Sequence, residues 1–379
     1  VLALNLASTE DPRDRMAARA YFERALTIRE QVLGPAHRFT AESLNNLALY
    51  LAATEDPKDR AAARPLFERA LEIHELALGP AHPDTAKSLN NLALYLAAAE
   101  DPIERAAARA YYDRALTIRE QVLGPAHPET AESLNNVALY LDATEDPRDR
   151  TAARHLFERA LEIHELALGP MHPHTAVSLM SLADYLQKTG DPFDFAAARP
   201  LCERALALNE KVLGQMHPDT ATSLNNLAAY LEKTGDPADF TAARPLYERA
   251  LAIWEEALGA THPHTALCLR NLANYLQKTV DRADRIAARP LFERALEIHE
   301  LALGPAHPDT AKSLNYLALY LAAAEDPKDR AAARPLFERA LEIDELALGP
   351  MHPHTAVSIM NLADYLQKTG DPFDFAAAR

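Results

Sequence analysis

The feature that most constrains this chain is an internal repeat of 45 residues, which runs through all 379 residues without an insertion. An acidic residue followed by Arg-Ala-Leu recurs at Glu23, Glu68, Asp113, Glu158, Glu203, Glu248, Glu293 and Glu338. A histidine recurs with the same step at His37, His82, His127, His172, His217, His262, His307 and His352. A fixed period of this length indicates a repeat architecture, in which copies stack on their neighbours instead of surrounding one core.

The array is expected to occupy residues 1–379 as a single domain. The first and the last nineteen residues share one register, so both ends fall inside a repeat, and the start at Val1 suggests a fragment. Residues 62–102 and 287–327 are identical except that Asn91 corresponds to Tyr316, which points to recent duplication.

The composition excludes several classes of protein. With 39 Lys and Arg against 55 Asp and Glu, the formal charge is −16, which argues against a nucleic-acid binder. Two cysteines provide neither a disulfide framework nor a structural zinc site, so a reducing, cytoplasmic location is expected. No run of about eighteen apolar residues is present, so no membrane span is expected.

Each repeat reads as two antiparallel helices. In one copy the first helix starts at Pro83 and ends near Ala99, with Leu89, Leu92 and Leu96 on one apolar stripe. Gly79-Pro80 ends the helix before it, and Asp101-Pro102 reads as the turn that leads into the next helix.

The second helix is clearest between Arg60 and Leu78, where Ala63, Phe67, Ala70 and Ile73 share one face. A proline at Pro65 predicts a mild kink or a late start of the regular helix, at a loosely packed position. Neither helix can bury its stripe alone, so the repeats predict an all-α solenoid of stacked helix pairs.

The repeat resembles the tetratricopeptide repeat, and more closely its kinesin-light-chain type. The residues that carry this resemblance are Leu78-Gly79, His82-Pro83-Asp84-Thr85-Ala86 and Ser88-Leu89-Asn90-Asn91-Leu92-Ala93. The loop between helices is longer than in that family, and its glycine is kept only at Gly190, Gly235 and Gly370. The resemblance implies a right-handed superhelix whose concave groove, lined by the first helices, holds peptides.

Asparagines on the first helices are the candidate peptide-binding residues. They are Asn45, Asn46, Asn90, Asn91, Asn135, Asn136, Asn225 and Asn226. An amide offers both a donor and an acceptor to a peptide backbone. The alternative is that one asparagine of each pair bonds between helices and stabilises the stack.

A cationic and amide-rich stretch follows on the sixth first helix, at Arg270, Asn271, Asn274 and Lys278. If a carboxylate or an acidic peptide docks in the groove, this stretch is where we expect it, with Arg270 as a bidentate clamp. The alternative is a solvated helix face.

Other residue patterns do not point to chemistry. The histidines lack the convergent spacing of a metal site and are expected to cap helices. Cys202 and Cys268 are expected to be buried, and neither a nucleophile with its base nor a phosphate-binding loop is present. Trp254 shares its register with seven residues of four types, a variety that predicts an exposed position. That register holds Arg29, His74, Arg119, His164, Asn209, His299 and Asp344.

The sequence therefore predicts a protein–protein interaction scaffold that is not an enzyme and needs no cofactor. Two alternatives remain open. The array is the sensor or docking arm of a larger switch or enzyme, or it assembles with itself by end-to-end stacking, because its ends share register.

Overall fold

The structure is a computed structural model that describes residues 12–54, 57–99, 102–144 and 146–369, and within these ranges every regular element is an α-helix. The second helices of the repeats are α2 (Pro12–Leu33), α4 (Pro57–Leu78), α6 (Pro102–Val122), α8 (Pro147–Ala167), α10 (Pro192–Val212), α12 (Pro237–Ala257), α14 (Arg282–Ala302) and α16 (Pro327–Ala347). The first helices are α3 (Arg38–Ala52), α5 (Pro83–Ala97), α7 (Pro128–Asp142), α9 (Pro173–Lys188), α11 (Pro218–Lys233), α13 (Pro263–Gln277), α15 (Pro308–Ala322) and α17 (Pro353–Thr369). The predicted all-α array of helix pairs is confirmed.

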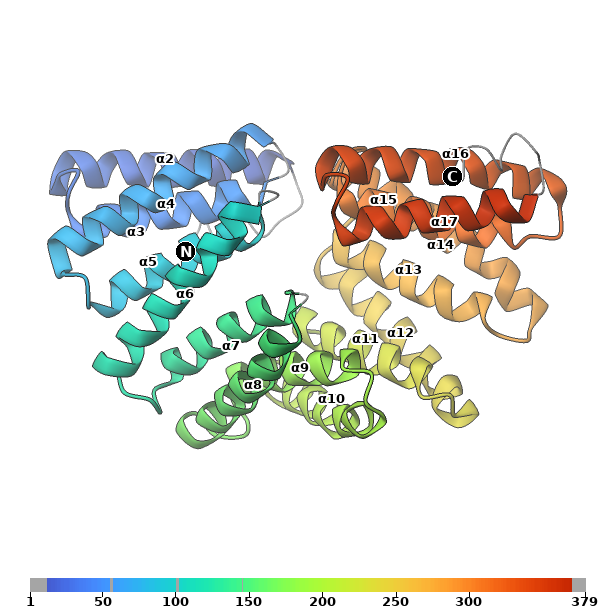
Figure 1. Cartoon of the computed structure of the whole chain (residues 1–379), viewed down its shortest axis with the longest axis horizontal. Helices are drawn as coiled ribbons and strands as arrows, with labels where there is room; N and C mark the ends of the chain where they lie inside the picture. The colour runs from blue at the N-terminus through green and yellow to red at the C-terminus, as the bar shows by residue number, and fades with distance from the viewer. Residues whose placement is uncertain (1–11, 55–56, 100–101, 145, 370–379) are drawn as a thin grey trace. The chain divides into compact units, whose positions relative to one another are not determined.

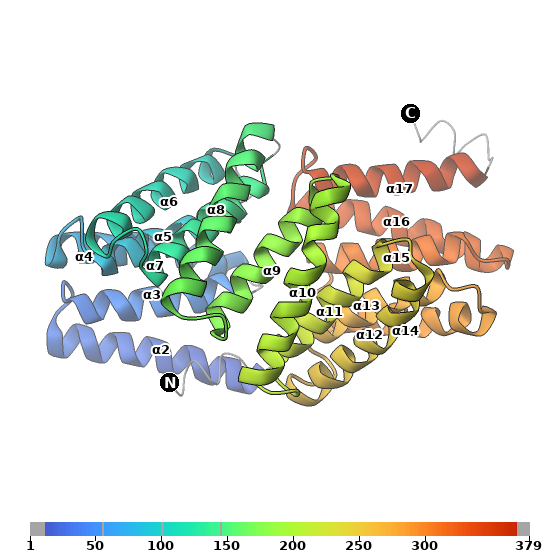
Figure 2. The ribbon, with the colours of Figure 1, turned by 90° about the horizontal axis from the view of Figure 1, so that it is seen from below.

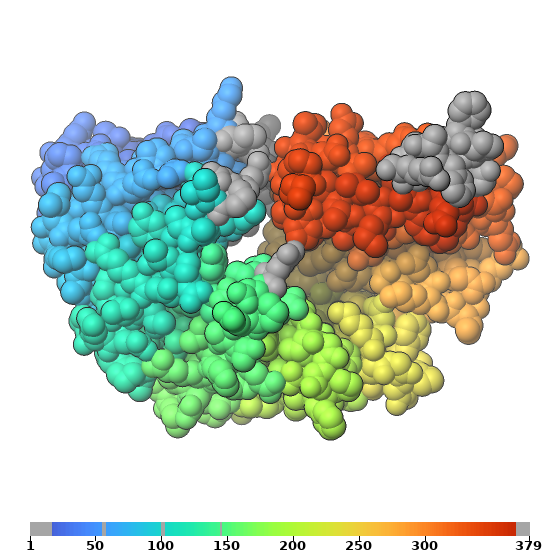
Figure 3. All heavy atoms as spheres, in the orientation of Figure 1, coloured from blue at the N-terminus to red at the C-terminus, as the bar shows by residue number. Residues whose placement is uncertain are grey.

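The chain forms two compact units, residues 1–230 and 231–379, with the boundary inside α11. In the first unit the helices from α2 to α10 stack in chain order (Figure 1). The helices from α12 to α17 do the same in the second unit (Figure 2). Successive repeats within each unit adjoin as bands of colour in the space-filling view (Figure 3).

The first helices begin at the recurring histidine, whose capping role is confirmed. The Nδ1 atom of His82 accepts a hydrogen bond from the backbone N–H of Asp84 at 3.1 Å, and the other seven histidines make the same bond. Three residues after the histidine, the hydroxyl of Thr85 donates to the carbonyl oxygen of Gly79 at 2.9 Å. Gly79 lies at φ +95°, where it ends the preceding helix. The His-Pro-x-Thr motif therefore closes one helix and opens the next.

Most second helices begin at an aspartate-proline pair, whereas α14 begins at Arg282 after Asp281. Asp146 is an N-cap, and its Oδ1 accepts from the N–H of Arg148 at 2.8 Å. The expected late start at Pro65 is wrong, because α4 begins at Pro57 and Pro65 lies inside it. The prediction that this register is loosely packed is confirmed, since Pro65 and His155 are exposed. A proline there directs its ring to solvent, so the helix tolerates it.

The core repeats with the sequence. Ala41 and Leu44 of α3 pack on Ala70 and Ile73 of α4, and Leu26 of α2 packs against the same cluster. Equivalent clusters recur at later repeats in both units. Each repeat thus buries its stripes partly within its own helix pair and partly against its neighbour, as expected of a solenoid.

The two sides of each stack differ in how closely their helices approach. Consecutive first helices contact one another, α3 with α5 and α5 with α7 in the first unit, and α13 with α15 in the second. Consecutive second helices contact one another less. The first helices therefore line the inner side of the curvature in each unit, the face that the sequence predicts as the groove.

Ion pairs connect the outer helices of neighbouring repeats. Arg19 bonds both Glu23 on its own helix and Asp59 on the next second helix, each at 2.9 Å. The same arrangement recurs at Arg154, with Glu158 at 3.0 Å and Asp194 at 2.8 Å. These arginines are about 40% exposed, so each pair contributes only about 0.2–1 kcal/mol. The Glu- and Arg-rich second helices are thus a mostly solvated outer face.

Candidate functional site

The register of Trp254 is buried, so the expectation that its variety indicates exposure is wrong. Trp254 is 1% exposed, and the residues at the same register in six other repeats are buried as well. These are His74, Arg119, His164, Asn209, His299 and Asp344, with exposures between 2 and 5%. Only Arg29 on α2, among the described copies, has a partly exposed side chain, at 35%.

This register forms a polar junction between repeats. Nδ1 of His74 lies 2.7 Å from Oγ of Ser88, and the amide of Asn45 donates to the same Oγ at 2.8 Å. Nε2 of His74 lies 3.3 Å from the carbonyl oxygen of Arg38. The neutral Nε2–H tautomer satisfies all of these contacts, since Ser88 accepts from Asn45 and donates to His74. Each junction thus joins three helices from two repeats.

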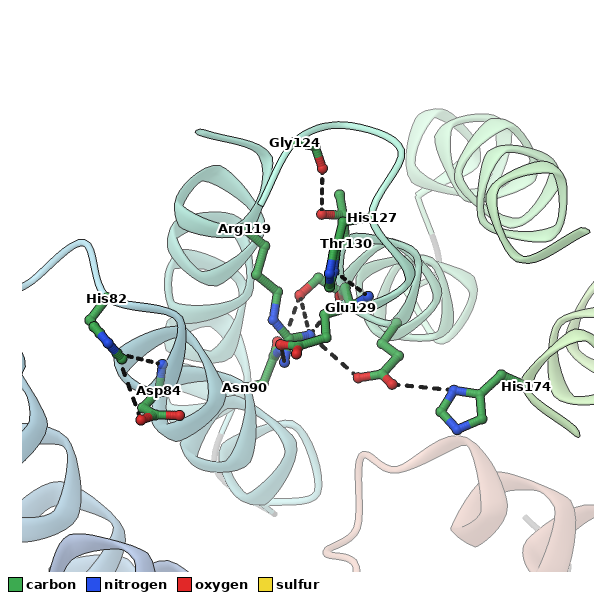
Figure 4. Close-up of polar contacts among 11 residues, drawn as sticks. His82, Asp84, Asn90, Arg119, Gly124, His127, Glu129, Thr130 and His174 are labelled. Atoms are coloured by element: carbon green, nitrogen blue, oxygen red, sulfur yellow. Dashed lines mark hydrogen bonds and ion pairs between the residues drawn. The ribbon is translucent and has the colours of Figure 1, made fainter. Parts of the chain in front are cut away.

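The partners at the junction change chemistry while the serine stays. The guanidinium of Arg119 donates to Ser133 Oγ at 3.0 Å and to the carbonyl oxygen of Glu129 at 2.7 Å, while Asn90 donates to Ser133 at 3.0 Å (Figure 4). In the last described junction the roles reverse, and Ser358 donates to a carboxylate oxygen of Asp344 at 2.5 Å. A serine hydroxyl both donates and accepts, so it fits histidine, arginine, asparagine or aspartate.

The junction at Trp254 is the exception. Here the serine is replaced by Cys268, which is fully buried and donates weakly to the carbonyl oxygen of Tyr247 at 3.4 Å. The indole of Trp254 meets the ring of His264 edge-on at 5.5 Å. A signal for burial was present in the sequence, since the one copy with an aromatic residue at this register is also the one copy without the serine.

Removing the hydroxyl of Ser88 is expected to destabilise the first unit. The Ser88→Ala change leaves the amide of Asn45 and Nδ1 of His74 buried without a partner, which costs about 1–3 kcal/mol. The measurement is urea unfolding followed by far-UV circular dichroism. Thr222→Ala, on the same kind of helix but with its hydroxyl bonded only to the carbonyl oxygen of Pro218, is the control. An equal effect of both changes would contradict a special role of the junction.

The structure divides the paired asparagines into two roles. Asparagines at the first of the two registers are 4–8% exposed and point into the stack, at Asn45, Asn90, Asn135, Asn225 and the unpaired Asn315. Three of these amides donate to the serine of the next repeat, at Ser88, Ser133 and Ser358. The second of each pair is less enclosed and lies on the inner face, at Asn46, Asn91, Asn136, Asn226 and Asn271. The second asparagines are therefore the more accessible of the two registers.

Arg270 replaces the first asparagine in the second unit. Its guanidinium lies over the ring of Tyr316, 5.1 Å from the centroid, and its buried Nε has no hydrogen-bond partner. Burial lowers the pKa of Arg270 below its usual value, an effect partly offset by Tyr316 and Asp309. No carboxylate of the described residues lies within ion-pair distance of this guanidinium. The pair of Arg270 and Tyr316 is thus a cation on an aromatic ring, with donors left over.

Asn274 and Lys278 of the cationic stretch converge on a carboxylate of the chain itself. Glu232, whose side chain is 7% exposed, accepts from Nζ of Lys278 at 2.7 Å and from the amide of Asn274 at 3.2 Å. Its other oxygen accepts from the hydroxyl of Tyr247 at 2.9 Å. Burial and Glu232 raise the pKa of Tyr247. An incoming carboxylate at Asn274 and Lys278 therefore competes with Glu232, whereas at Arg270 it does not.

Leucines stand next to the second asparagines on the inner face of the first unit. Leu49, Leu94 and Leu139 occupy one register on α3, α5 and α7, and they are 37%, 57% and 45% exposed. They lie three residues after Asn46, Asn91 and Asn136, one helical turn further on.

Two further expectations concern cysteines and metals. Both cysteines are buried, as predicted, and burial raises the pKa of Cys202 to about 11. Cys202 occupies a register that holds Phe or Tyr in the other copies. Within the described ranges, no three His, Cys, Asp or Glu side chains are placed to hold a metal ion. None of the described helices is long and apolar enough to cross a membrane.

Models of the tetratricopeptide repeat match most of the chain. One matches residues 2–59, 58–104, 105–149 and 193–239, and another matches residues 130–174, 220–264 and 265–309. The search of curated proteins finds no match.

Solved structures of similar chains include kinesin light chain-like repeat proteins. A putative kinesin light chain from Podosopora anserina, described as nearly identical TPR-like repeats, is 25% identical, with a TM-score of 0.45. The match covers 58% of this chain and 97% of that one. BtubC (BKLC) from P. vanneervenii is 20% identical with a TM-score of 0.36, over 72% of this chain and 92% of that one.

Proposed function

Because this chain belongs to the tetratricopeptide repeat family, which mediates protein–protein interaction, we propose that it is a non-catalytic scaffold holding a peptide or protein segment on its inner face. The observation that carries the proposal is that the two asparagines of each pair on the first helices differ in burial. The first asparagine of each pair is buried in the stack, where Asn45 and Asn90 bond the serine of the next repeat, while the second asparagine is half-buried on the inner face and the leucines beside it are exposed. Half-buried amides beside exposed apolar side chains suit a polypeptide, which offers both backbone groups and side chains.

The Arg270–Tyr316 pair is the place on this face where we propose that an acidic group of the ligand binds. Its guanidinium has unused donors and no competing carboxylate, and an arginine fork matches a carboxylate with two parallel hydrogen bonds. Asn271 and Asn274 lie on the same helix as Arg270, and Lys278 caps its C-terminal end.

Changing Arg270, Asn271 and Asn274 together to alanine is expected to abolish capture of the acidic partner. The measurement is affinity capture from a proteome with the native chain and the triple variant, followed by a binding titration with the captured protein. Lys233→Ala, at a neighbouring inner-face position, is the control. A partner that stays bound to the triple variant would place the site elsewhere on the array, and a chain that captures nothing would contradict the scaffold proposal.

End-to-end stacking is a second candidate, favoured by two exposed faces. Ile28 on α2 is 49% exposed, whereas Ile73 at the same register is 5% exposed and packs on a first helix. Ile359 on α17 is 44% exposed, whereas Leu314 at the same register is fully buried against a second helix. The two faces are complementary halves of one repeat, so α17 of one copy can pack on α2 of another. Light scattering over a concentration series tests this, and a mass that stays monomeric contradicts it.

A further inference from the structure

A hollow in the first unit reaches from the inner face to one of the second helices. It has a volume of about 460 Å³ and lies between α5, α6 and α7. Much of its lining is apolar and comes from Leu94 and Ala97 on α5 and from Leu139 and Ala143 on α7, while Tyr112 reaches it from α6. A mostly apolar hollow of this size with a few polar groups is typical of a site for a small molecule.

The hydroxyl of Tyr112 is a polar group that the chain itself leaves unused. Tyr112 is 2% exposed and lines the hollow, yet no residue in the described part of the chain forms a hydrogen bond with its hydroxyl. Its ring meets that of Tyr140 with the centroids 5.9 Å apart, but the hydroxyl of Tyr140 donates to the carbonyl oxygen of Arg105 at 3.1 Å. A buried hydroxyl without a partner is costly, so a ligand oxygen that bonds it gains affinity.

The second unit contains a tyrosine at the same register with its partner in place. Tyr247 lies three repeats after Tyr112, and its hydroxyl donates to Oε2 of Glu232 at 2.9 Å. In the first unit the register of Glu232 holds Ala97, which lines the hollow. The alanine therefore leaves both the open space and the unpaired hydroxyl. A ligand in the hollow takes the place that the side chain of Glu232 takes in the second unit.

The same comparison indicates that the ligand is uncharged. Glu232 also accepts from Asn274 at 3.2 Å and from Lys278 at 2.7 Å. In the first unit Leu139 and Ala143 occupy these two registers. The tyrosine hydroxyl is therefore the one donor of the three that remains, and a single neutral donor does not balance the cost of burying a carboxylate. A carbonyl or ether oxygen costs less to bury, and one hydrogen bond satisfies it.

Arg105, the one charged residue among the described residues of the lining, is already engaged. Its Nη1 donates to the carbonyl oxygen of Ala99 at 3.2 Å, just beyond the end of α5. Arg285 and Arg330 make the equivalent bond in the second unit, so this contact caps a first helix. Burial raises the pKa of Tyr112 to about 12, so its phenol stays protonated and donates. The polar contact offered at the bottom of the hollow is thus a neutral donor.

The size of the hollow sets the size of the ligand. An apolar cavity of about 150 Å³ holds one benzene ring. The hollow, at about 460 Å³, therefore has room for two fused rings with a short side group. The rings of Tyr112 and Tyr140 in its wall suit packing against a flat aromatic body.

We propose that the hollow between α5, α6 and α7 binds a small, uncharged aromatic molecule whose carbonyl or ether oxygen accepts a hydrogen bond from Tyr112. This site goes beyond the scaffold function proposed above and does not depend on it. It also lies apart from the Arg270–Tyr316 pair, which belongs to the second unit and is proposed for an acidic group.

The test uses the whole chain and prodan, a neutral naphthyl ketone whose fluorescence moves to the blue in apolar surroundings. A titration is expected to show saturable binding with blue-shifted emission. Two naphthalenes then compete with prodan: acetylnaphthalene has a neutral acceptor, and naphthoate has a charged one. We expect acetylnaphthalene to displace prodan at a clearly lower concentration than naphthoate. Equal or better displacement by naphthoate would overturn the uncharged ligand, and the absence of saturable binding would overturn the site.

Tyr112→Phe tests the hydrogen bond without disturbing the stack, because phenylalanine is the chain's own residue at this register, at Phe22, Phe67, Phe157, Phe292 and Phe337. It is expected to weaken binding of acetylnaphthalene several-fold and to leave binding of ethylnaphthalene, which has no oxygen, unchanged. Tyr247→Phe is the matched control, because that hydroxyl bonds Glu232, and it is expected to change neither affinity. An equal effect of Tyr112→Phe on both naphthalenes would overturn the hydrogen bond to the ligand.

Ala97→Gln is expected to fill the hollow and abolish prodan binding, and the chain already carries glutamine at this register, at Gln187 and Gln277. Ala322→Gln, the same change on α15 of the second unit, is the control and is expected to leave binding unchanged. Unchanged binding with Ala97→Gln would place the probe elsewhere and overturn the site. Displacement of prodan by the captured protein partner, but not by acetylnaphthalene, would assign the hollow to that partner and overturn the small-molecule site. The scaffold proposal is judged separately, by the capture experiment.

Discussion

Replacing Trp254 by alanine is expected to lower the free energy of unfolding by about 3–5 kcal/mol, the usual cost of deleting a large buried aromatic side chain. Trp254 is 1% exposed at a junction where the other repeats have a hydrogen-bonded polar pair. Alanine leaves a cavity, and the ring of His264 loses the indole that meets it edge-on at 5.5 Å. Urea unfolding followed by far-UV circular dichroism measures the effect, because the change removes the only tryptophan of the chain.

The control for Trp254→Ala copies a residue pair that the chain already has at another junction. Trp254→His combined with Cys268→Ser recreates the pair that His299 and Ser313 form at 2.7 Å. We expect this double variant to be more stable than Trp254→His alone, because only the serine offers the buried imidazole a good hydrogen bond. A loss below about 1 kcal/mol for Trp254→Ala would contradict the burial of this register.

Acidification is expected to destabilise the array through its buried junction histidines. Burial lowers the pKa of His74, His164 and His299, and brings that of His299 from 6.5 to about 4. Arg270 and His307 lower it further, and Asp309 opposes them. The folded chain therefore binds fewer protons than the unfolded chain below pH 6.5, so stability is full above that pH and falls as pH drops toward 4. His299 alone accounts for about 2 kcal/mol by about pH 5.

The measurement is the free energy of unfolding from urea titrations at pH values between about 7 and 5. The variant that changes His74, His164 and His299 to asparagine is the control, because Asn209 already fills this register and donates to Ser223 at 3.0 Å. Asparagine does not titrate, so we expect the free energy of unfolding of this variant to change clearly less with pH over this range. The same slope in both proteins would show that carboxylates, not these histidines, cause the loss.

Local features of the fold were predictable from the sequence because they depend on residues close in the chain. The capping of Asp84 N–H by His82 and the helix end at Gly79 involve neighbours within a few residues. The start of α4 was not predictable from the sequence, because a proline such as Pro65 usually marks a helix boundary. The helix continues through it, since the missing N–H and the ring both lie at the exposed side of a packed helix pair.

The candidate site was predictable only in outline. The face of the first helices and its asparagines followed from the repeat, but the division between Asn90 and Asn91 did not. Neighbouring residues on a helix point about 100° apart, and which of them faces the next repeat depends on how the repeats are rotated in the stack. The same rotation brings Lys278 and Asn274, two residues of the expected anion site, to Glu232, whose carboxylate neutralises the charge of Lys278.

The sequence by itself determined the period, the helix pairs, their caps and the stacking of the copies, because a 45-residue repeat with two apolar stripes has no other way to bury them. The tertiary structure alone decided the burial of Trp254 and the pairing of Asn45 with Ser88. Those contacts join residues of different repeats, 43 positions apart for Asn45 and Ser88. Variation at this register did not indicate exposure, because a serine hydroxyl both donates and accepts and so pairs with several buried polar side chains, while Cys268 replaces the serine where Trp254 stands.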